Sequence, residues 1–125
     1  MALKRIRLEL ARTKEFPDGA ANRGYEFVAP LTADGILDLE GWQAERERCV
    51  VRRFWASEGE EHGRLIHRGS RWAFHYDGDD AGEDEPIFKF DRHSFREGEY
   101  VSITEHDGEQ RTFRVAGVRD IRSGA

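Results

Sequence analysis

RLIHRGSRWAFHY, residues 64–76, is the stretch that decides the fold of this chain. It predicts a β-hairpin closed by Gly69 and Ser70, because glycine at the first central position supplies the positive φ that a type II′ turn requires. Apolar residues alternate with polar ones on both arms, which is the pattern of half-buried antiparallel strands.

The two-residue loop also predicts which side chains share a face of this hairpin. Leu65 is expected opposite Phe74, and His67 opposite Trp72. Tyr76 falls on the same face, because successive side chains of a strand point to opposite sides. The sequence therefore predicts one apolar face that carries a single histidine.

Alternation of the same kind predicts further strands on both sides of the hairpin. They are expected within residues 3–12, 25–29, 49–55, 87–90, 101–104 and 113–118. Pro30 is expected to end the second of these or to mark an edge, with residues 20–24 as loop before it. Residues 38–48 are expected to contain one short helix, with Asp38 as its N-cap.

The register of the last hairpin follows from its apolar positions. A two-residue turn at residues 107–108 would set apolar side chains against polar ones. A three-residue loop instead pairs Ile103 with Phe113 and Val101 with Val115, so the pattern favours a bulged turn.

These elements predict a mainly β protein. We expect a small antiparallel barrel, or a sandwich, of about seven strands with one short helix. A barrel is preferred because closure removes exposed strand edges. The length of 125 residues suits one domain, residues 1–125, with a short flexible tail at residues 122–125.

Composition limits the partners of this domain. Charged residues make up 36% of the chain and the net charge is −5, which weighs against nucleic acid and against an anionic membrane surface. Cys49 is the one cysteine, so no internal disulfide can form. The N-terminus carries charges where a signal peptide is apolar, and no run is long enough to span a membrane. The sequence predicts a soluble cytoplasmic protein.

Motifs for catalysis, cofactors and metals are not found in the chain. The five histidines lack the spacing of a zinc site. Residues 77–82 resemble the start of a calcium loop, but Ala81 and Phe88 stand where oxygen ligands are needed. The sequence therefore predicts no catalytic residues, no metal and no cofactor.

A candidate ligand-binding site remains. His67, Trp72 and Tyr76 share one strand face and could line the mouth of a barrel. Arg53 and Trp55 lie in phase on a neighbouring strand, and an inward-facing Arg53 would need a partner for its charge. These residues define the predicted site.

The function expected from the sequence is that of a small binding or regulatory β-domain, whose ligand is an unidentified protein or small molecule. A small enzyme with a pocket around His67 and Trp72 is the alternative. A second alternative is single-stranded nucleic-acid binding through an arginine and aromatic face, which the net charge disfavours. The arginines of that face would be Arg52, Arg64, Arg68 and Arg71.

Overall fold

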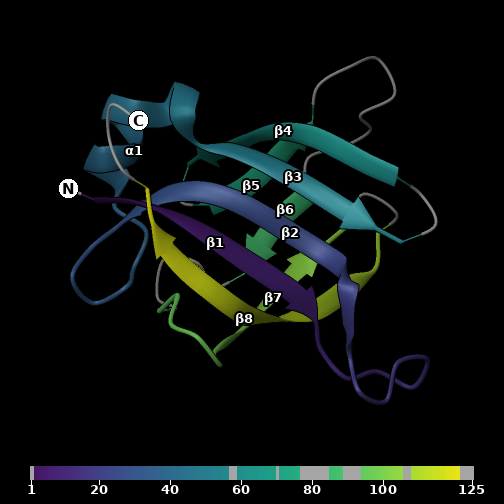
Figure 1. Ribbon diagram of the computed structural model, residues 1–125. Helices are drawn as coiled ribbons and strands as arrows, with labels where there is room; N and C mark the ends of the chain where they lie inside the picture. The colour runs from purple at the N-terminus through teal and green to yellow at the C-terminus, as the bar shows by residue number, and fades with distance from the viewer. Residues whose placement is uncertain are drawn as a thin grey trace.

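The computed structural model describes residues 2–56, 59–69, 71–76, 85–88, 94–105 and 108–121. Within these residues, the chain forms a closed barrel of eight antiparallel strands, in which each strand pairs with its neighbour in the sequence (Figure 1). The last strand pairs with the first and closes the barrel. The predicted mainly β barrel is confirmed.

The strands and helices follow one another along the chain with short connections. The strands are β1 (Ala2–Leu10), β2 (Ala20–Leu31), β3 (Val50–Trp55), β4 (Gly59–Arg68), β5 (Arg71–Tyr76), β6 (Glu85–Phe88), β7 (Tyr100–Thr104) and β8 (Gln110–Asp120). The helix α1 (Leu39–Glu45) and the 3-10 turn η1 (Arg46–Arg48) lie between β2 and β3.

The barrel interior is filled by side chains from alternate positions of its strands. The ten largest fully buried side chains are Tyr25, Phe27, Phe74, Phe95, Phe113, Ile6, Leu8, Leu65, Ile103 and Val51. Aromatic rings stack on one another across the interior, with the Tyr25 and Phe74 centroids 5.1 Å apart. An eight-stranded barrel is just wide enough for side chains to fill its interior or for one small ligand to bind there, and these buried side chains occupy the interior of this barrel.

The hairpin of β4 and β5, predicted from residues 64–76, has the predicted register. Leu65 pairs with Phe74 and His67 with Trp72, and Gly69 has a φ of 61°. Leu65, Trp72 and Phe74 are buried, which confirms the predicted inward face.

The last hairpin does not have the predicted pairs, and part of its predicted turn, at residues 106–107, lies outside the described residues. Val101 pairs with Phe113, and Ile103 pairs with Arg111, so the expected pairs of Ile103 with Phe113 and Val101 with Val115 are wrong by two residues. The alternation of apolar residues predicts which face of a strand each side chain occupies. It cannot distinguish registers that differ by two residues, because such a shift leaves every side chain on the same face. The positive φ of Gly108, at 87°, places the turn earlier than the apolar pattern suggested.

Two glycines allow neighbouring strands to approach closely. A Cβ at Gly24 would lie 1.9 Å from the Leu8 carbonyl oxygen, and one at Gly63 would lie 2.0 Å from the His75 carbonyl oxygen. Glycine at such places lets a sheet bend into a barrel. Residues 20–24, predicted as loop, form the start of β2, which also runs through Pro30.

The helix covers one end of the barrel (Figure 1). Asp38 accepts a hydrogen bond from the Gly41 amide at 3.2 Å, as predicted for an N-cap. The Trp42 indole donates to the Leu65 carbonyl oxygen at 2.9 Å and ties the helix to β4. We call this the helix end, and the opposite end, where β3 finishes at Trp55, the Trp55 end.

Some predictions fall on residues that the structure does not describe. They are the acidic loop at residues 77–84, the second turn residue Ser70 and the tail at residues 122–125. Among the described residues, no helix has both the length and the apolar character needed to cross a membrane.

Candidate functional site

Four of the five predicted site residues are divided between the two ends of the barrel, and the fifth lies between them. His67 and Trp72 lie at the helix end, where their ring centroids are 4.6 Å apart. Arg53 and Trp55 lie at the Trp55 end of β3, and Tyr76 pairs with Gly63 between the two ends. The sequence predicted one site, whereas the structure separates its members.

The helix end is filled by aromatic rings. Trp42 from α1 packs edge-on against Trp72, with centroids 5.6 Å apart, and lies 6.1 Å from the His67 ring. Trp72 is 3% exposed and Tyr76 is 2% exposed. These rings therefore form part of the core, and His67 lies half-buried at its margin.

The Trp55 end contains a buried ion pair. The Arg53 Nε donates to a Glu105 carboxylate oxygen at 3.0 Å, and the two side chains are 6% and 1% exposed. The Tyr25 hydroxyl donates to the same oxygen at 2.6 Å, and Arg111 donates to the other oxygen at 2.6 Å. Three donors thus satisfy one buried carboxylate, which is what burial of a charge requires.

Electrostatics keep Arg53 charged inside the barrel. Burial by itself lowers the pKa of Arg53, but the attraction of Glu105 and the contact with Tyr25 outweigh it, so the pKa is raised. The sequence indicated that Arg53 needs a partner, but it did not identify Glu105. A usable signal was present, because Glu105 continues the inward alternation of Val101 and Ile103.

Guanidinium groups surround the half-buried indole of Trp55. The Arg53 guanidinium carbon lies 4.5 Å from the Trp55 ring centroid, that of Arg111 5.5 Å and that of Arg23 5.8 Å. Arg23 also lies 4.4 Å from the Phe16 ring, so it contacts two aromatic rings. Arg53 and Arg111 both bind Glu105, so the buried carboxylate also holds in place two of the guanidinium groups that contact the Trp55 indole.

A pocket of about 380 Å³ opens beside these rings. Its wall includes Leu10 and the two rings Phe16 and Trp55. Its charged groups are Lys14, Arg23 and Arg111 together with the carboxylates of Glu15 and Glu109. Arg23 donates to the Asn22 side chain at 3.2 Å and forms no ion pair with any described residue. Arg111, which also lines the pocket, is held by Glu105.

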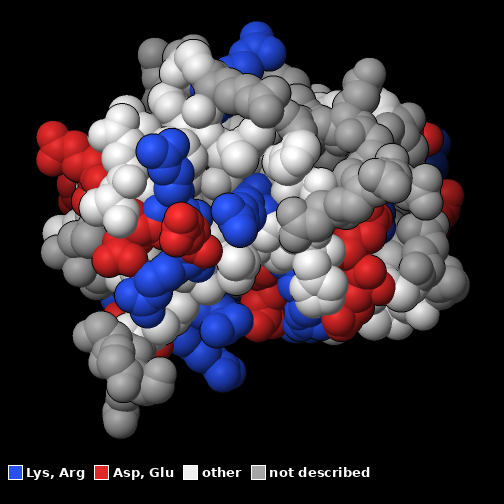
Figure 2. Space-filling model, turned by 90° about the horizontal axis from the view of Figure 1, so that it is seen from above, with Lys and Arg blue, Asp and Glu red and all other residues white. Residues whose placement is uncertain are grey.

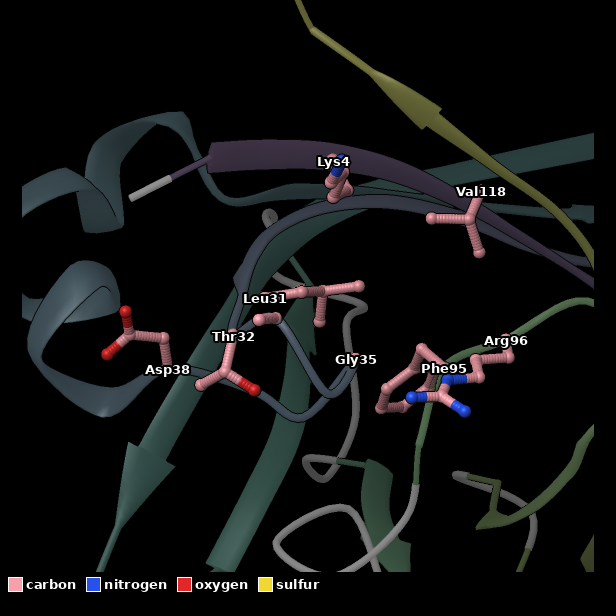
Figure 3. Close-up of a pocket in the computed structure, with 9 residues that line it drawn as sticks. Lys4, Leu31, Thr32, Gly35, Asp38, Phe95, Arg96 and Val118 are labelled. Carbon is pink, nitrogen blue, oxygen red and sulfur yellow. The ribbon is translucent and has the colours of Figure 1, made fainter.

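A larger pocket, of about 550 Å³, lies near the helix end (Figure 3). Two of its three charged groups have structural roles: Lys4 pairs with Asp120, and Asp38 caps α1. The third, Arg96, forms no ion pair with any described residue. Figure 3 shows Asp38 directed toward the helix and away from Phe95 and Arg96. Among the described residues, Arg96 lies over no aromatic ring, whereas Arg23 at the Trp55 end contacts two.

Reactive groups do not mark any other place in the described part of the chain. No cluster of three or more metal-ligating side chains occurs there. Cys49 is fully buried, and burial followed by the charge of Glu45 raises the pKa of its thiol to about 11, which keeps it protonated. Comparison of the chain with protein-family models, with curated proteins and with solved structures gives no match in any of the three.

Proposed function

We propose that this protein is a small-molecule binding domain whose site is the pocket at the Trp55 end, and that its ligand carries a carboxylate beside a flat apolar group. The observation that carries the proposal is Arg23, a guanidinium stacked on two aromatic rings at the pocket wall with no carboxylate partner among the described residues.

Stacking leaves the hydrogen-bonding edge of Arg23 available. The guanidinium carbon lies 4.4 Å from the Phe16 ring centroid and 5.8 Å from that of Trp55. One of its terminal nitrogens donates to the Asn22 side chain, and its remaining N–H donors lie in the guanidinium plane. That plane matches a carboxylate, which accepts two parallel hydrogen bonds. The rings also hold the side chain in place, so little conformational freedom is lost on binding.

The buried charges behind Trp55 support the same proposal. Glu105 holds Arg53 and Arg111, and both guanidinium groups contact the Trp55 indole. A ring whose position is fixed by such a network is a prepared surface for a flat ligand. Residues Arg53 and Trp55, predicted from the sequence, keep this role in the proposal, Arg53 as a positioning residue.

Size and charge favour a small ligand over nucleic acid. The pocket volume of about 380 Å³ lies in the range of small-molecule sites. In Figure 2, Lys and Arg atoms interleave with Asp and Glu atoms over the visible face, and no broad region of one sign appears there. A nucleic-acid surface needs a continuous positive field.

The other candidate functions have weaker support. An enzyme site around His67 and Trp72 would need an open pocket, but Trp72 is in the core. A protein partner remains an alternative for the outer face of the barrel. Ligand binding that depends on His67 rather than on Arg23 would favour the enzyme.

The proposal is tested with three probes of one shape: benzoate, benzamide and benzylamine. Isothermal titration should show roughly millimolar binding of benzoate, as expected for so small a ligand, and no binding of the neutral or cationic analogue. Arg23→Gln should weaken benzoate binding about tenfold or more, since a charged hydrogen-bond pair contributes on the order of 1.5–3 kcal/mol.

The matched control is Arg64→Gln, which changes an exposed arginine on β4. It should bind benzoate as the parent protein does. Equal binding of benzamide, or unchanged affinity in Arg23→Gln, would overturn the assignment of the site.

A further inference from the structure

Two pairs of charged residues stand opposite each other on β1 and β8, one pair with opposite charges and one with like charges. Glu9 stands opposite Arg114, and their side chains form an ion pair at 3.8 Å. At the start of β1, however, Arg5 stands directly opposite Arg119. Like charges at directly opposed positions destabilise a sheet, because their Cβ atoms lie about 5 Å apart.

The surrounding carboxylates do not neutralise this pair. Arg119 is exposed and forms no ion pair with any described residue. Arg5 reaches Glu26 only at 3.6 Å, and Glu26 also binds Arg7 at 3.2 Å and Arg52 at 3.3 Å. Arg7 and Arg52 each have a second carboxylate partner, in Glu9 and Glu60, whereas Arg5 has Glu26 alone among the described residues. Within the same part of the chain, Arg119 has no counterion.

The excess positive charge lies beside a hollow in the barrel wall. The pairing of β1 with β8 shifts between Arg7 and Leu8, which leaves Ala116 without an opposite residue. Gly117 stands opposite Arg7, and nothing lies within 4 Å of where its Cβ would be. The resulting pocket, of about 460 Å³, is lined by these small residues, by Arg5, Arg7 and Arg119, and by the carboxylates of Glu9 and Glu26. Both carboxylates are already engaged in ion pairs with arginines.

Arg7 does not fill this hollow. It donates to Glu9 at 2.8 Å and to the Ala21 carbonyl oxygen at 2.9 Å, and its guanidinium lies 4.5 Å from the Phe54 ring. The side-chain hydrogen bond to Glu9, with smaller contributions from Glu26, raises the pKa of Arg7. Its charge is therefore matched within the protein, in contrast to that of Arg119.

We propose that this hollow is a binding site for a phosphate group, held between Arg5 and Arg119 above Gly117. A doubly charged anion would turn the repulsion between the two arginines into attraction to a shared partner. Tetrahedral phosphate oxygens suit two guanidinium groups that approach from adjacent strands. The site lies outside the barrel and goes beyond the carboxylate pocket at Trp55.

The test uses inorganic phosphate as the probe, in thermal melts and NMR titrations at fixed ionic strength. Phosphate should raise the melting temperature of the parent and shift the Gly117 amide resonance in a saturable way. Arg119→Gln should melt higher than the parent without phosphate, because the repulsion is removed. It should also bind phosphate about tenfold more weakly or worse.

Two further arms complete the experiment. Arg64→Gln, an exposed arginine opposite His75 on another strand pair, should respond to phosphate as the parent does. Glycerol 3-phosphate binding more tightly than inorganic phosphate would identify a phosphorylated small molecule as the source, and equal affinities would identify free phosphate. An unchanged affinity in Arg119→Gln, an equal loss in Arg64→Gln, or no response of the parent would overturn the proposal.

Discussion

The two ends of the barrel bury ionisable groups in opposite ways. At the helix end, burial and the charge of Glu45 raise the pKa of the Cys49 thiol from 9.0 to about 11, against the smaller opposing effect of Arg48, so the thiol stays neutral. At the Trp55 end, the buried Arg53 stays charged because it forms an ion pair with Glu105, which is also buried. A low-dielectric interior keeps a group neutral unless a partner is supplied.

This difference indicates where binding is to be sought. Aromatic packing of Trp42, His67 and Trp72 closes the helix end and accounts for the residues there. A buried ion pair is a poor source of stability compared with apolar packing. The proposal gives the pair beside Trp55 another role, which is to position Arg53 and Arg111 around the indole.

The largest predicted effect concerns the charged end. Glu105→Ala removes the buried carboxylate that pairs with Arg53 and leaves the partly exposed Glu61, at 3.5 Å, which should lower the free energy of unfolding by about 3–5 kcal/mol. Urea denaturation measures this loss. Glu109→Gln, at a side chain that is 70% exposed, is the control and should change stability by less than about 0.5 kcal/mol. A loss below about 1 kcal/mol in Glu105→Ala would contradict the role given to the pair.

The next effect concerns Cys49 and depends on pH. The raised pKa means that the folded protein retains the thiol proton where the unfolded chain releases it, so this stability is full below pH 9 and is lost as the pH rises to about 11. Across this window the parent should lose about 3 kcal/mol more than Cys49→Ala. Denaturation midpoints at several pH values measure the difference, and parallel curves for the two proteins would show that burial does not perturb the thiol.

A smaller effect is expected at the margin of the helix end. His67→Ala removes a half-buried ring that contacts Trp72 and Trp42, which should lower stability by about 1 kcal/mol. Benzoate binding at the Trp55 end should be unchanged. If the variant instead keeps its stability and loses ligand binding, the functional end has been assigned wrongly.

The smallest effect is expected at the rim of the helix end, where Lys4 pairs with Asp120. The Asp120 side chain is 76% exposed, so solvent screens the interaction. Asp120→Asn should therefore change the unfolding free energy by no more than about 0.5 kcal/mol. A loss above about 1 kcal/mol in thermal or urea unfolding would mean that surface charge pairs contribute to closing the barrel.

The sequence predicts local features of this protein better than distant ones. The Gly69 turn and the alternation around it predicted the first hairpin residue by residue, and Asp38 predicted the helix start. Alternation also placed Arg53 inside the barrel. It could not identify Glu105, which is 52 positions away, because the barrel closure that joins them depends on all the strands between. For the same reason His67 and Arg53, which the sequence grouped in one site, lie at different ends.

The three tryptophans give the most direct test of where ligands bind. Trp55 lies at one end of the barrel, whereas Trp42 and Trp72 lie together at the other. In a ¹H–¹⁵N NMR titration with benzoate, we predict a saturable shift of the Trp55 indole N–H resonance with the other two unmoved, and no such shift in Arg23→Gln. Shifts of Trp42 and Trp72 with a static Trp55 would contradict the account.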